Sequence, residues 1–331
     1  MNLDTINNSK DYFYQRKFEK VLSFFDFEKN ELSHSKNQKV SILLYRHYFS
    51  NELGLITKLI KKIFLYFFQR IYFFFLLFTI QSLKKSDDRL IVSLTSQPSR
   101  IKNCWITILS ILNQEFQNYK IILVLSSLEV SPQNLPWTLG ILQKKGLEIL
   151  WIKENLKSYQ KLIPTRIKFP LSRIVTFDDD VVYEKWRLKI LYEESIKTPT
   201  AIIGYRGKKL KRSQNKVIYN YLSWDEEATT KTFSKDIFLT GVGGILYPPN
   251  KEFDSLVTDF KLAKELAPTA DDIFFWGVSY HLKIKRISLG FHFIEDIIEL
   301  RKSPRLCDKN NSQFKNKNDL ALKKVTSYFD I

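Results

Sequence analysis

The stretch Arg173-Ile-Val-Thr-Phe177 is followed directly by Asp178-Asp179-Asp180, so that an apolar run gives way to three carboxylates. The β-branched and aromatic residues of the run predict a buried strand, and the acidic residues mark its exposed carboxyl end. Open α/β sheets bind ligands at that edge. Hard carboxylate oxygens suit Mg²⁺ or Mn²⁺, which usually hold phosphates as well as side chains. The first hypothesis is a metal–diphosphate site; the alternative is an acidic turn that caps a helix over Glu184–Lys197.

Strands and helices alternate from Asp87 up to this junction. The predicted strands are Leu90–Leu94, Tyr119–Leu125, Leu147–Ile152 and Ile174–Phe177, and the helices between them are Ile101–Asn113, Trp137–Lys145 and Tyr159–Phe169. Such alternation predicts a parallel sheet with right-handed crossovers. The first strand is followed by Ser-Gln-Pro-Ser-Arg100 and not by a GxGxxG turn, so a nicotinamide-dinucleotide fold is unsupported. We therefore expect phosphate to be bound through a metal ion.

Composition limits the class of protein and its partners. With 331 residues and 44% hydrophobic content, the chain can bury one large core and carry an appendage. The 52 Lys and Arg against 35 Asp and Glu give a formal charge of +17, which suits nucleic acid, an anionic membrane or phosphorylated sugars. Charge alone does not choose among these partners. Cys104 and Cys307 show no metal-site spacing, which favours two inert thiols in a reducing compartment.

Residues 1–86 differ in texture from the rest and are predicted to form a separate N-terminal extension. Apolar residues recur at helical spacing between Leu55 and Ile80, but charged residues interrupt them and the longest apolar run is only Ile71–Ile80. A spanning helix needs roughly 20 predominantly apolar residues. We therefore expect an amphipathic helix that lies on an anionic membrane surface between flanking lysines. A helical hairpin packed on the main domain and a true membrane span are the alternatives.

Five motifs follow one another along the remaining chain, and each of them alone is weak. They are Leu94-Thr-Ser-Gln-Pro-Ser-Arg100, Tyr159-Gln-Lys-Leu-Ile-Pro164, the acidic triplet, Thr240-Gly-Val-Gly-Gly-Ile-Leu-Tyr-Pro-Pro249 and Pro268-Thr-Ala-Asp-Asp272. In this order they resemble a bacterial GT-A-fold glycosyltransferase of the family 2-like, DxD-containing type that makes surface polysaccharides. The resemblance implies a Rossmann-like, nucleotide-binding mixed sheet flanked by helices over residues 87–331, with an α-helical N-terminal extension over residues 1–86.

The resemblance also implies how a nucleotide-sugar donor is held. Asp178 and Asp180 match the residues that bind Mn²⁺ or Mg²⁺, an ion that stabilises a leaving diphosphate by bridging its oxygens. Asp179 is implied as a contact to the ribose or the sugar. Thr95 and Arg100, at the end of the first strand, would lie near the nucleotide. A UDP- or GDP-sugar is the expected donor.

Lys161 and the glycine-rich motif are each open to a second interpretation. Lys161 could bind the diphosphate, whereas the alternative is an exposed lysine on a solvated helix face. Gly243 and Gly244 would let the backbone approach a sugar closely, because glycine lacks a Cβ; the alternative is a tight turn before a strand over Ile245–Tyr247. Trp224 is either a wall for the acceptor sugar or a plain core residue.

The pair Asp271-Asp272 matches the position of the catalytic base in the family. Transfer with inversion needs a carboxylate that takes the proton of the acceptor hydroxyl. The resemblance implies Asp272 in this role, with Asp271 orienting it or the acceptor. From the residues alone, Thr269-Ala-Asp-Asp272 also fits a capping box that opens a helix over Ile273–Leu282.

The sequence thus predicts a metal-dependent, inverting glycosyltransferase that moves a sugar to a glycan or lipid-linked acceptor, peripheral to the inner face of the cell membrane. A haloacid-dehalogenase-type phosphatase is one alternative, since Asp178 to Val182 satisfies its motif formally and would make Asp178 a nucleophile. A non-catalytic nucleic-acid-binding protein is the other. Its only support is the charge and the cluster Lys208-Lys-Leu-Lys-Arg212, which lacks interleaved aromatic residues, so no nucleic-acid partner is expected.

Overall fold

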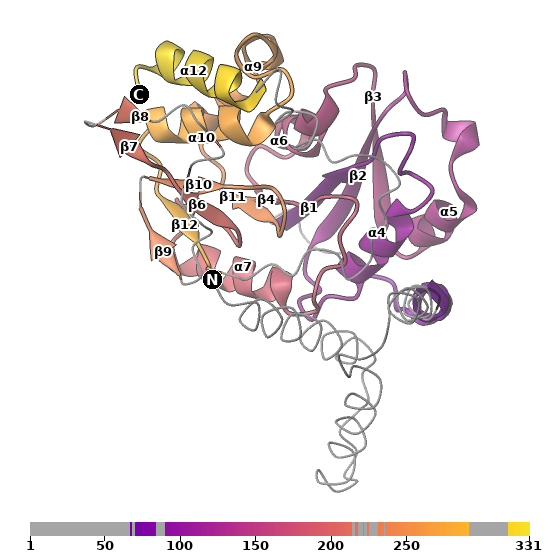
Figure 1. Ribbon diagram of the computed structural model, residues 1–331. Coiled ribbons are helices and arrows are strands. Elements are labelled where there is room, and N and C mark those ends of the chain that lie inside the picture. Colours follow the sequence, from indigo (N-terminus) through magenta and orange to yellow (C-terminus); the bar gives the residue numbers. More distant parts are fainter. Residues whose placement is uncertain are drawn as a thin grey trace, which may run out of the picture. The chain divides into compact units, whose positions relative to one another are not determined.

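The structure is a computed structural model that describes residues 67, 70–83, 90–213, 216–217, 221, 224, 231–234, 236–290 and 317–331 (Figure 1). The chain divides into two compact units, Met1–Phe75 and Leu76–Ile331. Residues 84–89 lie outside the described ranges, and so do residues 1–66, 68 and 69. The predicted domain boundary at residue 86 therefore stays a prediction.

One eight-stranded sheet forms the centre of the second unit, in the order β3-β2-β1-β4-β11-β5-β12-β9. In its first half, β1 pairs in parallel with β2 and β4, and β2 pairs in parallel with β3. The bounds of these strands are Leu90–Thr95 for β1, Lys120–Ser126 for β2, Leu147–Ile152 for β3 and Arg173–Thr176 for β4. Each lies within one residue of its predicted ends. The strands β1, β2 and β4 are almost wholly buried, and a strand buried on both faces appears as an unbroken apolar run.

The second half makes the sheet mixed. Here β11 is antiparallel to both β4 and β5, β12 is parallel to β5, and β9 is antiparallel to β12. The bounds of these strands are Ile202–Gly204 for β5, Thr232–Phe233 for β9, Ile245–Tyr247 for β11 and Arg286–Ser288 for β12. The strand β10, which lies outside this sheet, spans Ile237–Leu239. Two further pairs form small sheets, β10 with β6 (Gly207–Lys209) and β7 (Arg212–Ser213) with β8 (Lys216–Val217). This mixed α/β architecture confirms the predicted fold class.

Helices lie on both sides of the sheet; in Figure 1, α6 and α10 lie above it and α7 lies below it. The helices are α4 (Cys104–Leu112), α5 (Trp137–Lys144), α6 (Ile163–Lys168), α7 (Arg187–Lys197), α8 (Lys251–Val257), α9 (Phe260–Leu266), α10 (Asp271–His281) and α12 (Lys317–Phe329). Two 3₁₀ turns, η1 (Pro132–Asn134) and η2 (Lys157–Lys161), precede α5 and α6.

One helix predicted as continuous is interrupted in the structure. The predicted helix Tyr159–Phe169 is the turn η2 followed by α6, which has Pro164 in its first turn, where the missing N–H of proline is tolerated. The helices α8 and α9 are also separate, because the Asp259 side chain accepts a hydrogen bond from the Leu262 N–H and starts a new helix.

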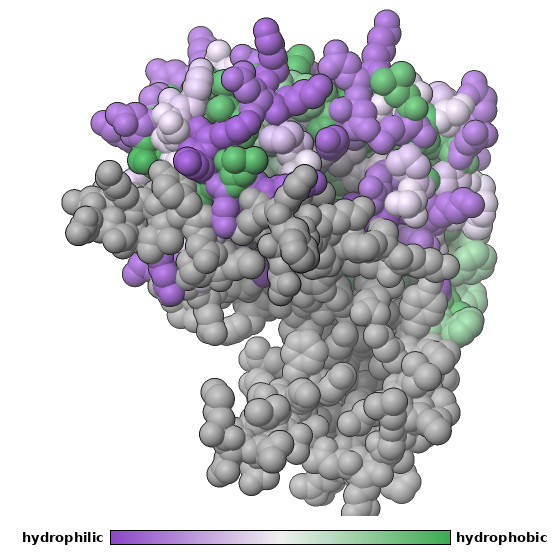
Figure 2. All heavy atoms as spheres, turned by 45° about the horizontal axis from the view of Figure 1, so that its top comes forward, coloured by the Kyte–Doolittle hydropathy of each residue, from purple (hydrophilic) through white to green (hydrophobic). Residues whose placement is uncertain are grey.

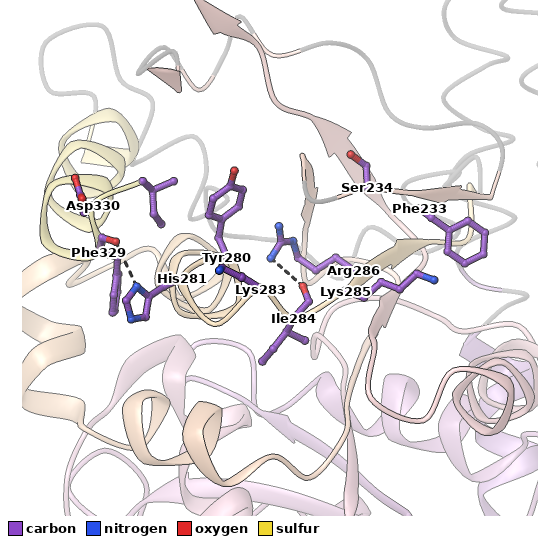
Figure 3. Close-up of a pocket in the computed structure, with 11 residues that line it drawn as sticks. Phe233, Ser234, Tyr280, His281, Lys283, Ile284, Lys285, Arg286, Phe329 and Asp330 are labelled. Carbon is purple, nitrogen blue, oxygen red and sulfur yellow. Dashed lines mark hydrogen bonds between the residues drawn. The ribbon is translucent and has the colours of Figure 1, made fainter. Parts of the chain in front are cut away.

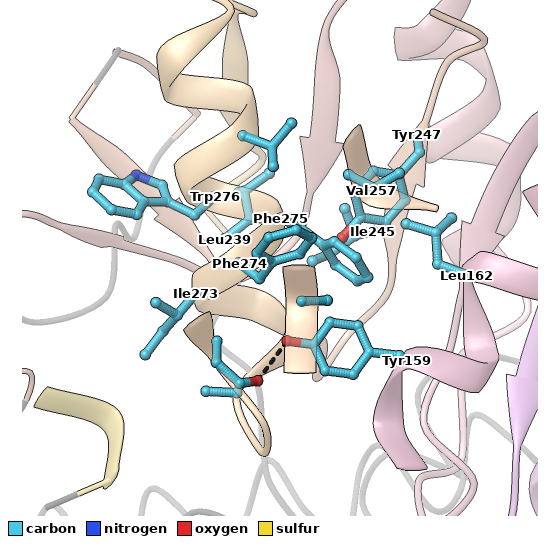
Figure 4. Packing of buried hydrophobic residues seen from close by; sticks show 14 of the residues in the cluster. Tyr159, Leu162, Leu239, Ile245, Tyr247, Val257, Ile273, Phe274, Phe275 and Trp276 are labelled. Carbon is cyan, nitrogen blue, oxygen red and sulfur yellow. Dashed lines mark hydrogen bonds between the residues drawn. The ribbon is translucent and has the colours of Figure 1, made fainter. Parts of the chain in front are cut away.

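An aromatic core joins η2 to α10 (Figure 4). Tyr159 is fully buried, and its ring meets those of Phe274 and Phe275 edge-on, with centroid separations of 6.1 and 5.5 Å. The Tyr159 hydroxyl donates to the carbonyl oxygen of Ala267 over 2.6 Å, just before α10 begins. Edge-to-face packing and a buried hydrogen bond together fix the 3₁₀ turn against the start of this helix.

The helix α12 covers α10 although residues 282–316 separate them in sequence. Of these, residues 291–316 lie outside the described ranges. The Phe329 ring lies 6.5 Å from that of Phe274 and 5.2 Å from that of His281. The buried residues of α12 are Asn318, Ala321, Leu322, Val325, Thr326 and Phe329. Where α9 and α12 come forward in Figure 2, the surface is mostly hydrophilic with scattered single apolar side chains.

Residues 70–79 form a helix with two apolar sides. Phe73 and Leu77 are buried, whereas five large apolar side chains are between 47% and 65% exposed: Phe67, Ile71, Phe74, Phe75 and Phe78. The Lys145 ammonium donates to the carbonyl oxygen of Ile80 over 2.6 Å, which places a cation at the carboxyl end of this helix. No helix within the described ranges combines the length and the hydropathy needed to cross a bilayer.

Candidate active site

The acidic triplet lies at the topological switch point of the sheet. From β1 the chain crosses to β2 and β3 on one side, and β4 then pairs with β1 on the other side. The register Ser93 to Thr176 brings the carboxyl ends of β1 and β4 together. Crevices of this kind are where open α/β sheets bind ligands. The fold therefore places Thr95 and the residues from Asp178 to Asp180 at the edge that the sequence predicted.

Arg100 ties the triplet to the loop after β1. Its guanidinium lies 2.7 Å from Asp180 Oδ2 and 3.1 Å from Asp179 Oδ1. The Ser96 hydroxyl donates to Asp179 Oδ2 over 2.5 Å. Burial raises the pKa of Asp179 to about 7, against the opposing charge of Arg100. Asp179 and Asp180 are thus both buried, while the side chain of Asp178 is 27% exposed.

Lys161 connects the triplet with the second acidic motif. Its ammonium lies 3.2 Å from Asp178 Oδ1 and 3.3 Å from Asp271 Oδ2. Burial by itself would lower the pKa of Lys161, but the neighbouring carboxylates outweigh burial and hold this pKa well above its usual value. The side chain is only 9% exposed, so the alternative of a lysine on a solvated helix face is wrong.

Asp271 and Asp272 open α10, but the predicted capping box does not form. The N-cap residue is Ala270, which offers no side-chain acceptor, and Thr269 lies outside the helix. Asp272 Oδ2 instead accepts a hydrogen bond of 2.9 Å from the Gly241 N–H, which belongs to another part of the chain. Its second oxygen, Oδ1, is buried without a hydrogen-bond partner among the described residues.

Asp272 has the electrostatic environment of a weak acid. Burial, reinforced by the negative charge of Asp271, raises the pKa of Asp272 to about 7, although Lys161 and the Gly241 N–H act in the opposite direction. A carboxylate with this pKa is a stronger base than an ordinary aspartate. A pKa near 7 suits a group that must accept a proton at neutral pH.

The glycine-rich motif forms the tight turn that was one of its two interpretations. The Gly244 N–H donates to the Gly241 carbonyl oxygen over 3.1 Å, and β11 begins at the next residue, Ile245. Gly243 and Gly244 have φ angles of 101° and 98°, which residues with a side chain rarely adopt. A Cβ at Gly244 would overlap the Phe177 ring. The turn is therefore fixed against the end of β4.

Gly241 lies where the motifs meet, and the Lys161 ammonium occupies the place of its missing side chain. A Cβ added there would lie 2.7 Å from Lys161 Nζ. The same position is 3.4 Å from Asp272 Oδ1 and 3.5 Å from Asp178 Oδ1. Oxygen atoms from both acidic motifs thus surround one point beside the glycine turn.

The carboxylates of the triplet are donors that suit a hard divalent cation. Asp178 and Asp180 offer carboxylate oxygens, which Mg²⁺ and Mn²⁺ prefer, and one oxygen of each lies beside a cationic side chain, Lys161 at 3.2 Å and Arg100 at 2.7 Å. Within the described residues, no three His, Cys, Asp or Glu side chains form a complete ligand set. A site with one or two carboxylates completed by substrate phosphates is the usual arrangement for Mg²⁺. Asp178 and Asp180 remain the proposed ligands.

Other residues at the site were not found from the sequence. Gln160 donates to Thr95 Oγ1 over 3.0 Å, and this hydroxyl donates in turn to the Val124 carbonyl oxygen over 2.9 Å. The Asp178 N–H donates to the Tyr183 hydroxyl over 2.9 Å, and Arg187 donates to the Gly243 carbonyl oxygen over 3.2 Å. Gln160 belongs to a motif that had been recognised, whereas nothing local to Tyr183 or Arg187 marks them.

Three further residues are structural. Trp224 is buried in the core, with its ring 5.1 Å from that of Phe238, so it is not an exposed wall for an acceptor. Cys104 is a buried free thiol, as predicted, and Cys307 lies outside the described residues. His281 contacts the carbonyl oxygen of Phe329 over 3.3 Å.

A cavity of about 610 Å³ lies away from this cluster, at the other end of α10 (Figure 3). Its walls come from the carboxyl end of α10, from β9 and β12 and from the end of α12. We locate the candidate active site by the convergence of carboxylates, because neither acidic motif lines this cavity.

Comparisons with known proteins found similar structures but no matching sequence. No family model matches the chain, and no curated protein matches it. A crystal structure of residues 1–349 of S. aureus TarS is 13% identical, with a TM-score of 0.42, over 72% of each chain. The complexes of this protein with UDP and with UDP-GlcNAc are 14% and 11% identical, with TM-scores of 0.42 and 0.41. They cover 73% of this chain, and 72% and 73% of the other.

Proposed function

We propose that this protein is a metal-dependent, inverting glycosyltransferase that moves a sugar from a nucleotide-sugar to a glycan or lipid-linked acceptor in surface polysaccharide synthesis. The observation that carries the proposal is the ion-paired bridge of Lys161 between Asp178 and Asp271 at the switch point of the sheet. Motifs far apart in sequence thereby meet where a nucleotide would bind.

The two acidic motifs divide the chemistry between them. Asp178 and Asp180 would hold a divalent ion, which would supply positive charge to the departing nucleoside diphosphate. Asp272, with its raised pKa and its carboxylate held by the Gly241 N–H, takes the proton of the acceptor hydroxyl. Lys161 pairs with Asp271, the residue next to this carboxylate.

The exposed apolar side of residues 67–79 supports a membrane partner. We propose that Ile71, Phe74, Phe75 and Phe78 insert into the interface of an anionic membrane at its inner face, where a lipid-linked acceptor would be found. Lysines that flank this segment in sequence add electrostatic attraction. Binding to anionic vesicles should weaken as salt is added. Replacement of Phe74 and Phe75 by serine should reduce it further, whereas unchanged sedimentation of that variant would contradict the proposal.

Ligand-induced thermal stabilisation tests the main proposal. We expect one member of a panel of UDP-, GDP-, CMP- and dTDP-sugars, UDP-GlcNAc included, to raise the melting temperature only with Mn²⁺, because a ligand that binds the native state stabilises it. Asp180→Asn should abolish this response. Glu148→Gln, at an exposed position on β3, is the matched control and should retain it.

Two results would count against this function. If Asp180→Asn binds the nucleotide-sugar as tightly as the wild type in Mn²⁺, the metal site has been misplaced. If phosphate is released from simple phosphomonoesters and Asp178→Asn alone abolishes that release, the protein is a phosphatase with Asp178 as nucleophile.

A further inference from the structure

Lys161 is enclosed by acidic residues from two directions. Its ammonium contacts Asp178 at the end of β4 and Asp271 at the start of α10, and it is nearly buried. The Tyr159 side chain, fixed between Phe274 and Phe275, anchors the turn η2 that carries the lysine. Lys161 is therefore held in place by the core, which distinguishes it from a flexible surface lysine.

The charge balance around this lysine is unfavourable without it. Asp178, Asp271 and Asp272 converge on the space beside Gly241, and Lys161 is the cation that contacts two of them. Buried carboxylates without a partner strongly destabilise a fold. Gly241 has no Cβ, and a Cβ there would lie 2.7 Å from the ammonium, so the bare backbone makes room for the Lys161 ammonium itself.

We propose that Lys161 is a positioning residue that takes the place of the divalent cation when no ion is bound: it holds Asp178 to Asp271 and releases Asp178 as the ion enters. This inference rests on the proposed function, since it assumes that Asp178 is a metal ligand. Lys161 and the ion compete for one carboxylate, so the protein alone binds the ion weakly. The phosphates of the donor supply the additional ligands that shift this competition.

The exchange gives Lys161 two successive roles. Before the ion binds, its positive charge keeps the acidic groups together and the fold stable. Afterwards its remaining partner is Asp271, the neighbour of the proposed base. Lys161 thereby couples occupation of the donor site to the position of α10, without itself touching the reacting atoms.

Mn²⁺ binding by Lys161→Met in the absence of nucleotide tests the proposal. We expect the variant to have a lower melting temperature without ion and an Mn²⁺ dissociation constant lower by about tenfold or more. This is the size expected when one neighbouring positive charge is removed, even under strong screening. Free Mn²⁺ can be counted by electron paramagnetic resonance, so the measurement does not depend on turnover. Lys153→Met, at an exposed position just after β3, removes the same charge and should leave both quantities unchanged.

A second pair of variants keeps the test decisive if Lys161→Met does not fold. Asp271→Asn and the double variant Lys161→Met/Asp271→Asn differ only in the lysine, and the double variant loses one charge of each sign. The double variant should bind Mn²⁺ more tightly than Asp271→Asn. Equal dissociation constants in both comparisons would overturn the proposal. If the dissociation constants are equal but the wild type still binds a nucleotide-sugar with Mn²⁺, the role of Lys161 is refuted and the proposed function is not.

Discussion

The two ends of α10 differ in a way that charge alone does not explain. The amino end carries Asp271 and Asp272, and the carboxyl end leads to the cavity beside His281, Lys283 and Lys285. Acidic groups at the start of a helix and basic groups at its end both suit the helix dipole, so neither set by itself indicates a site. The amino end differs because its acidic residues contact other elements: Lys161 of η2 pairs with Asp271, and the glycine turn donates a hydrogen bond to Asp272. Lys161 also pairs with Asp178, which follows β4.

At the carboxyl end, the polar groups are engaged in holding the fold. Arg286 is buried, and it donates to the Ile237 carbonyl oxygen over 2.9 Å and to the Ser279 hydroxyl over 2.8 Å. Lys285 lies over the exposed ring of Phe233, 4.6 Å from its centroid. Convergence of buried, ionisable groups from several elements marks a site more specifically than cavity volume does.

Asp272→Asn should have the largest effect and would show whether the amino end is catalytic. Loss of a general base lowers turnover by about 10²–10⁴-fold, with donor binding retained. Transfer rate, donor affinity and melting temperature should be measured together on the folded protein. A destabilised variant with near-normal turnover per folded molecule would mean that Asp272 serves only the structure.

The pH dependence should sharpen the same assignment. Because the pKa of Asp272 is raised to about 7, its carboxylate gains a proton as the pH falls below that value and can then no longer accept one. We expect kcat/KM to fall about tenfold for each pH unit below about pH 7 and to level off above it. The measurement needs buffers of constant ionic strength. A profile that is flat between pH 5 and 8 would exclude Asp272 as the base.

Gly244→Ala should show that the amino-end site depends on a rigid turn. Its φ of 98° and the Phe177 ring leave no room for a methyl group, so we expect the free energy of unfolding to fall by about 2–4 kcal/mol. Gly140→Ala is the matched control. No atom lies within 4 Å of its Cβ position in α5, and the change should stabilise the protein by about 0.5–1 kcal/mol. Denaturant titration distinguishes the two, and equal effects would contradict the assignment.

Lys285→Ala, at the carboxyl end, should have the smallest effect. The side chain of this lysine lies at the edge of the cavity and over an exposed ring, so we expect turnover within about twofold and stability within about 0.5 kcal/mol of the wild type. Steady-state kinetics with the donor and acceptor of the wild type provide the check. A loss of more than about tenfold would bring the cavity into the active site and end the contrast between the two ends of α10.

The local parts of this architecture could be predicted from the sequence. The strand Arg173–Thr176 and its acidic end are encoded in one short stretch, as are the other three parallel strands. The position of Lys161 could not be predicted in the same way. Helical periodicity predicted one helix over Tyr159–Phe169, whereas the chain forms η2 and then α6. Lys161, at the end of η2, is buried.

The capping box failed for a related reason. Its residues fit the local pattern, but Asp272 finds a donor in Gly241, which is distant in sequence, and Thr269 stays outside the helix. Propensities describe contacts between near neighbours, whereas tertiary partners decide between two locally acceptable arrangements. The resemblance supplied the roles of the acidic residues, and the fold supplied the bridge between them.

The packing of α12 on α10 has a consequence for the order of events during synthesis. The α10 face that meets Val325 and Phe329 stays bare on a growing chain until residues 317–329 have left the ribosome, because nothing earlier in the described chain occupies that place. A nascent chain that ends near residue 290 therefore exposes an aromatic surface while its acidic motifs are already made. Segments in this state are the ones that chaperones bind. The helix α12, made after both acidic motifs, is thus the one that covers the helix bearing the proposed base.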